Sequence, residues 1–65
     1  MPICEDVTVE LIGEDGNAFY ILGKVKKEMR KQGIVKYVID DFLEEAMSGD
    51  YDHLLRTCMK YVNVI

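Results

Sequence analysis

Apolar residues recur at intervals of three and four along residues 18 to 29, and this spacing constrains the fold more than any other feature of the chain. The recurring positions are Ala18, Ile21, Leu22, Val25 and Met29. Residues at this spacing lie on one side of an α-helix and form a buried stripe.

The ends of this helix carry recognisable signals. Asp15 or Asn17 can cap its start, and the helix then runs to about Gln32. Gly33 supplies a C-terminal cap, and the basic residues just before it suit the negative end of the helix dipole.

A β-hairpin is the alternative interpretation of the same segment. Asp15-Gly16 between two apolar runs is typical of a two-residue hairpin turn, with Phe19 to Leu22 as the second strand. The helical spacing continues well past Leu22, which favours the helix.

Two strands are expected at the ends of the chain. Val7, Val9 and Leu11 alternate with polar residues, which is typical of a half-buried strand. The segment from Tyr61 to Ile65 alternates in the same way and predicts a closing strand.

Two further helices are expected between the first helix and the closing strand. One fits Val35 to Met47, with its apolar stripe at Val35, Val38, Ile39, Phe42 and Ala46. The other begins after Asp50, a good N-cap, with its stripe at Leu55, Cys58, Met59 and Val62.

The predicted order is therefore β-α-α-α-β, an α+β fold with residues 1 to 65 in a single domain. If each short loop reverses the chain, the last strand runs parallel to the first. An isolated parallel pair is poorly stabilised and has open edges. Either the strands pair antiparallel, with different helix angles, or another subunit completes the sheet. Small size and open edges together favour a homo-oligomer.

Composition narrows the class of protein. The chain is 49% hydrophobic and 31% charged, as expected of a globular protein, and its net charge of −4 argues against general nucleic-acid binding. No apolar stretch reaches the roughly 18 residues of a membrane helix, and the acidic N-terminus does not resemble a signal peptide. Two reduced thiols, Cys4 and Cys58, are favoured over a single bridge, and a cytoplasmic location is expected.

Two adjacent blocks of opposite charge follow the first loop. The basic block comprises Lys24, Lys26, Lys27, Arg30 and Lys31, and the acidic block comprises Asp40, Asp41, Glu44 and Glu45. The basic block can bind a nucleotide phosphate or an acidic partner. The alternative is a solvated helix face that pairs partly with the acidic block.

The loop before the first helix is a candidate anion site. Free backbone N–H groups and the positive end of the dipole favour an anion there, and Gly13 and Gly16 permit close approach. Glu14 and Asp15 oppose a phosphate, and no Walker lysine or G-x-G-x-x-G motif is present. The alternative is an ordinary strand-to-helix connection with a capped helix start.

The segment Asp50-Tyr51-Asp52-His53 is the other place where chemistry is conceivable. A metal needs three or more convergent ligands, whereas Asp52 and His53 point in different directions on a helix. Cys58 lies at an unfavourable angle to His53 for a nucleophilic pair. We therefore expect no catalytic residues, no metal and no cofactor.

Together, the segments GEDGNAFYILGKVKKEMRKQG and SGDYDHLLRTCMKYVNV resemble a family of small, mostly hypothetical proteins encoded by bacteria and their phages. The resemblance covers nearly the whole chain. It implies no established activity for particular residues. A phage setting would imply a counter-defence role, since small phage proteins inhibit host immune proteins or sequester their nucleotide messengers.

The sequence thus predicts a small non-catalytic binding protein that works as a homo-oligomer and holds a nucleotide-like anion at its helix N-termini. The candidate contacts are Gly16, Asn17, Tyr20, Tyr51, His53 and Arg56. The alternative is a protein–protein inhibitor or adaptor, with a host protein as partner, that acts through an acidic helix face or an exposed strand edge.

Overall fold

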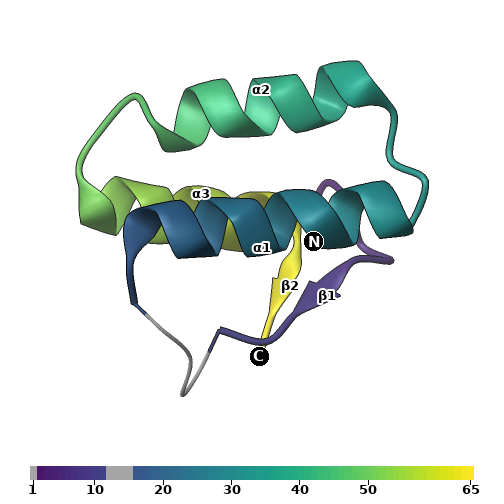
Figure 1. Ribbon diagram of the computed structural model, residues 1–65, viewed down its shortest axis with the longest axis horizontal. Helices are drawn as coiled ribbons and strands as arrows, with labels where there is room; N and C mark the ends of the chain where they lie inside the picture. Colours follow the sequence, from purple (N-terminus) through teal and green to yellow (C-terminus); the bar gives the residue numbers. More distant parts are fainter. Residues whose placement is uncertain (1, 12–15) are drawn as a thin grey trace.

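A computed structural model of the chain describes residues 2–11 and 16–65, and their order is the expected β-α-α-α-β. The elements are β1 (Thr8–Val9), α1 (Ala18–Lys31), α2 (Lys36–Ala46), α3 (Tyr51–Tyr61) and β2 (Asn63–Val64). The sheet lies on one side of α1 and α3, and α2 covers the other side of this helix pair (Figure 1). No described helix is long and apolar enough to cross a membrane.

The two strands pair parallel within one chain, with Thr8 opposite Asn63 and Val9 opposite Val64. Of the possibilities left open by the sequence, antiparallel pairing is therefore wrong. Backbone hydrogen bonds extend the pairing beyond the strands, from Cys4 N to Tyr61 O (2.7 Å) and from Leu11 N to Ile65 O (2.8 Å). These added bonds and the helices packed on one face stabilise a strand pair that would be marginal alone.

Helix α1 confirms the interpretation drawn from its apolar spacing. Its buried residues are Ile21, Leu22, Val25 and Met29. Because Phe19 to Leu22 are helical, the hairpin alternative is wrong, although Asp15 of its proposed turn lies outside the described residues.

The predicted end of α1 at Gly33 is also confirmed. Gly33 adopts a left-handed φ of 78°, its N–H bonds to Arg30 O (3.0 Å), and Ile34 N bonds to Met29 O (3.0 Å). This pair of bonds is the Schellman arrangement, which satisfies the last carbonyls of a helix and favours glycine at the left-handed position.

Two expectations for buried residues are wrong. Val35 is the N-cap of α2 and is 52% exposed, so it does not belong to the buried stripe. In α3, Met59 is 57% exposed and Leu55 is half-buried, whereas Leu54, Thr57, Cys58 and Tyr61 face the core. The stripe expected for α3 therefore lies partly to one side of the helix face that packs on α2 and the sheet.

Phe42 of α2 lies at the centre of the core and is fully buried. Its ring meets that of Tyr61 edge-on, with centroids 5.4 Å apart and planes at 68°. Edge-to-face pairs of this kind add to the stabilisation that area burial supplies. The contact fixes the C-terminal end of α3 against α2, directly before the chain enters β2.

Candidate functional site

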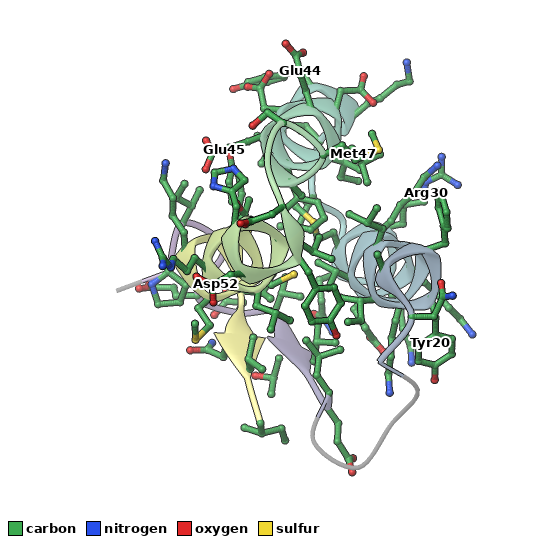
Figure 2. All side chains as sticks on the ribbon, turned by 90° about the vertical axis from the view of Figure 1, so that its left-hand side faces the viewer. Tyr20, Arg30, Glu44, Glu45, Met47 and Asp52 are labelled. Atoms are coloured by element: carbon green, nitrogen blue, oxygen red, sulfur yellow. The ribbon has the colours of Figure 1, made fainter. Side chains whose placement is uncertain are left out.

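The N-termini of α1 and α3 meet the C-terminus of α2 at one end of the molecule, which faces the viewer in Figure 2. The hydroxyl of Tyr51, the first residue of α3, donates a 2.6 Å hydrogen bond to the carbonyl of Gly16. This bond joins two of the segments that the sequence singled out, although they are 35 residues apart.

Asn17 and Asp50 cap the two helix N-termini at this end. The Asn17 side chain accepts hydrogen bonds from Phe19 N (2.9 Å) and Tyr20 N (3.3 Å). The Asp50 carboxylate accepts one from His53 N (2.9 Å). These caps occupy backbone donors that an anion would need, and the Asp50 charge repels a phosphate at α3.

An apolar hollow of about 330 Å³ opens between the three helix ends. Leu22, Ala46 and Leu54 line it together with the more exposed Phe19, Met47 and Tyr51. Among the described residues that line it, only Asp50 is charged. The hollow therefore suits an apolar side chain better than it suits an anion.

His53 has a structural task at this end of the molecule. Its Nε2 lies 2.8 Å from the carbonyl oxygen of Glu45 and 3.2 Å from Ser48 Oγ. Because a carbonyl only accepts, Nε2 carries the hydrogen and donates it to Glu45 O. Ser48 Oγ donates to the same carbonyl at 2.7 Å, so both side chains satisfy the last turn of α2.

The side chains of Arg56 and Tyr20 lie outside the apolar hollow. Arg56 forms an ion pair with Asp52 one turn earlier on α3, and both side chains are largely exposed. Tyr20 points away from the core on α1, and Figure 2 shows Asp52 and Tyr20 on opposite sides of the molecule. Of the six predicted contacts, the structure thus brings Gly16, Asn17 and Tyr51 together, and the Tyr20 backbone joins them through the Asn17 cap. The side chains of Tyr20, His53 and Arg56 have other surroundings.

Tyr20 instead belongs to a second hollow, which runs along the exposed side of α1. This hollow has a volume of about 380 Å³ and is lined by Phe19, Tyr20, Gly23, Lys24, Lys27 and Glu28. The Lys24 Nζ lies 5.9 Å from the centre of the Tyr20 ring, within the range of a cation–π contact. Aromatic rings beside lysines are a combination that can stack on a base and pair with a phosphate.

The acidic block of α2 forms a third hollow, between α2 and α3. It also measures about 380 Å³ and is lined by Asp41, Glu44, Glu45, Ser48 and Tyr61. The Lys60 ammonium group forms an ion pair with the Glu45 carboxylate at 3.2 Å. Among the described ion pairs, this one places a cation beside the acidic hollow. Ser48 and Tyr61 were not predicted to belong here, because their approach depends on how α3 packs against α2.

The negative charge of this hollow acts on Tyr61. Burial raises the pKa of the Tyr61 hydroxyl, the negative charge of Glu45 raises it further, and Asp41 adds to the effect, whereas Lys60 lowers it. A phenol whose ionisation is opposed by two carboxylates indicates a local excess of negative charge.

The two charge blocks do not pair with each other as the sequence suggested. The ion pairs between described residues are Lys31–Glu28, Lys36–Asp40, Arg56–Asp52 and Lys60–Glu45. None of them joins the basic block of α1 to the acidic block of α2. Both blocks therefore retain charges that a partner can neutralise.

The cysteines offer no reactive nucleophile. Cys4 and Cys58 are both free and buried. Burial raises the pKa of the Cys58 thiol to about 11 and also raises that of Cys4. A buried neutral thiol is a poor nucleophile and a poor metal ligand.

Within residues 2–11 and 16–65, no group of three or more His, Cys, Asp or Glu residues is arranged to hold a metal ion. Comparisons with protein-family models, curated proteins and solved structures found no match to the chain.

Proposed function

We propose that this protein is a small non-catalytic binding module that recognises a basic segment of another protein through the acidic hollow between α2 and α3. The single observation that supports this proposal is the cluster of Asp41, Glu44 and Glu45 around that hollow, with Lys60 as the described counter-charge. Three carboxylates against one ammonium group leave the surface negative, and such a surface steers and orients a positively charged partner.

Tyr61 makes this surface more than a row of exposed charges. Its ring is largely buried against Phe42, and it contributes to the wall of the hollow. An aromatic wall beneath carboxylates can accept the aliphatic stem of an arginine or lysine while the charged head meets the carboxylates. The expected partner is therefore an Arg- or Lys-rich segment, not an apolar one.

A matched peptide titration tests the proposal. Peptides are selected from a random library on the wild-type protein, and each selected peptide is compared with a version in which Arg and Lys are replaced by Gln. We expect Arg- and Lys-rich peptides that shift the amide resonances of Asp41, Glu45 and Ser48 and lose affinity as salt rises. The variant Asp41→Lys/Glu45→Gln should lose binding, whereas Glu10→Lys, at an exposed residue next to β1, should retain it. Selection of uncharged peptides, or binding that survives in the acidic-hollow variant, would rule out this function.

A nucleotide-like anion is the second candidate ligand, favoured by the hollow of Tyr20, Lys24 and Lys27 on α1. The phage setting implied by the resemblance would make such binding a counter-defence activity that sequesters a nucleotide messenger. This candidate predicts a ligand-induced rise in melting temperature across a nucleotide panel, lost in Tyr20→Ala and Lys27→Gln. The absence of a shift with every nucleotide would exclude it.

A further inference from the structure

The three most exposed large apolar side chains among the described residues lie at the start of α1 and at the two ends of α2. They are Phe19, Tyr37 and Met47, which are 81%, 71% and 60% exposed. Isolated exposed apolar residues are common on proteins, whereas several on one face mark an interaction surface.

On α1, Phe19 belongs to a stripe at spacings of four, three and four residues. The stripe comprises Phe19, Gly23, Lys26 and Arg30. On α2 and its C-cap, a matching stripe at spacings of three, four and three comprises Tyr37, Asp40, Glu44 and Met47. Residues at these spacings lie on one side of a helix, so each stripe is a continuous surface.

The two stripes are level with each other at both ends. Helices α1 and α2 run in opposite directions and are joined by residues 32–35 (Figure 1). Phe19 and Met47 line the same apolar hollow, and Arg30 and Tyr37 lie on either side of the connecting loop. Figure 2 shows Arg30 and Met47 pointing to the same side of the molecule.

We propose that this α1–α2 face binds the same face of a second copy of the chain, with a twofold axis running parallel to the helices. Such an axis keeps every residue at its own level and places α1 of one copy against α2 of the other. Phe19 then meets Met47 of the second copy, Lys26 meets Asp40, and Arg30 meets the Tyr37 ring. Each contact occurs twice, so the face is complementary to itself in shape and in charge.

The charges on this face are available for such a contact. Among the residues that the structure describes, Lys26, Arg30 and Glu44 take part in no ion pair, and Asp40 pairs only with the exposed Lys36, at 3.5 Å. An exposed pair of this kind contributes little and can be exchanged for an intermolecular one. Because α1 is positively charged and α2 is negatively charged on this face, packing α1 of one copy against α2 of the other is favoured. Packing α1 against α1 of the second copy would bring like charges together.

Gly23 supplies an independent indication of close approach. It lies in the middle of α1, where glycine destabilises a helix relative to alanine. A Cβ placed there would meet nothing within 4 Å, so packing inside the monomer does not require glycine. Its missing side chain leaves room for Glu44 of the second copy at the same level.

The first test measures association of the wild-type chain by sedimentation velocity over a concentration series, together with zero-length carbodiimide cross-linking. We expect a monomer–dimer equilibrium and a Lys26–Asp40 cross-link between copies, identified as intermolecular by mixing ¹⁴N- and ¹⁵N-labelled protein. Phe19→Ala should weaken the dimer at least roughly tenfold, because the most exposed aromatic side chain of the face is lost in both copies. Phe19 is exposed, so this variant keeps the monomer fold.

Charge exchange supplies the sharper test. Lys26→Glu/Arg30→Glu and Asp40→Lys should each be monomeric, because each variant places like charges opposite each other at residues 26 and 40, in both copies of that contact. Mixing the two variants should restore a heterodimer in native mass spectrometry, since both contacts again join opposite charges. The control Arg56→Glu, on the far side of the molecule, should dimerise as the wild type does.

A wild-type chain that stays monomeric to roughly millimolar concentration overturns the proposal. So does a dimer that forms equally well in the Lys26→Glu/Arg30→Glu variant, or a mixture that yields no heterodimer. None of these outcomes affects the peptide test of the acidic hollow, because the peptide test changes Asp41 and Glu45 and the dimer variants change no residue that lines that hollow.

Discussion

The Tyr51 hydroxyl donates a 2.6 Å hydrogen bond to the Gly16 carbonyl and so ties the start of α3 to the segment that leads into α1. Tyr51 is also close in space to this glycine, because a Cβ on Gly16 would lie 3.3 Å from the Tyr51 hydroxyl oxygen. The bond therefore links the start of α3 to the residues directly before α1.

Replacing Tyr51 by Phe should remove this bond and leave the ring in place. We expect a loss of about 0.5–1 kcal/mol in the free energy of unfolding, the usual net value of one partly exposed hydrogen bond. Urea denaturation measures the change, and hydrogen exchange should become faster at Asn17 and Ala18. The matched control is Tyr37→Phe, which removes an exposed hydroxyl with no partner among the described residues and should leave stability unchanged.

Replacing Asn17 by Ala should destabilise α1 through loss of its N-cap. The Asn17 side chain accepts from two backbone N–H groups that would otherwise have no partner in the helix, and such a loss typically costs about 1 kcal/mol. The variant Asn17→Asp preserves the acceptor and adds a charge that the helix dipole favours, so its urea midpoint should equal or exceed that of the wild type. Equal midpoints for the Ala and Asp variants would show that the cap does not stabilise the protein.

Two glycine-to-alanine changes should have opposite effects on stability. At Gly49, a Cβ would lie 2.8 Å from the His53 ring, so the ring must leave the Glu45 carbonyl and the variant should unfold more easily. At Gly23 a Cβ meets open space, so Gly23→Ala should stabilise the monomer by about 0.5–1 kcal/mol. Thermal melts of both variants, at concentrations where the chain is monomeric, check the two signs together.

Alkaline pH should destabilise the protein through Cys58. Burial raises the pKa of this thiol from 9.0 to about 11, so the folded state binds a proton that the unfolded state has released. The contribution of Cys58 to the free energy of unfolding is therefore complete below pH 9. It falls by about 1.4 kcal/mol per pH unit as the pH rises from 9 toward 11.

Urea denaturation from pH 8 to pH 11 measures this dependence. Tyr61, whose pKa is also raised, contributes in the same direction, so the comparison with Cys58→Ala isolates the thiol. We expect the variant to be less stable at pH 8, because it leaves a cavity, but to lose less stability as pH rises. Parallel curves for the two proteins would contradict a buried neutral thiol.

Sequence patterns located the ends of α1 correctly because those signals act over a few residues. Asn17 bonds to N–H groups two and three positions ahead, and Gly33 bonds back to Arg30. Both contacts form whenever the local backbone turns into or out of a helix, whatever the rest of the chain does. The same holds for Asp50, which caps α3 through His53 N.

Helix α3 shows where such reasoning stops. The stripe Leu55, Cys58, Met59 and Val62 and the stripe Leu54, Thr57, Cys58 and Tyr61 both have helical spacing, so periodicity alone cannot choose between them. The contact between Phe42 and Tyr61 and the sheet beneath α3 select the second stripe.

The candidate site was also only partly predictable from the sequence. Its residue types were visible in the sequence, but their grouping depended on how three helices end beside one another. Tyr51 reaches Gly16, His53 turns to the end of α2, and Arg56 pairs with Asp52 on the far side.

The sequence by itself determined the order of the elements and the caps of α1 and α3, because capping and helical spacing are interactions within one or two turns. Only the tertiary structure decided that the terminal strands pair parallel, that Leu54 is buried instead of Met59, and that Tyr61 lies beside Asp41 and Glu45. These outcomes depend on contacts between residues far apart in the chain, and local patterns are equally compatible with more than one set of such contacts.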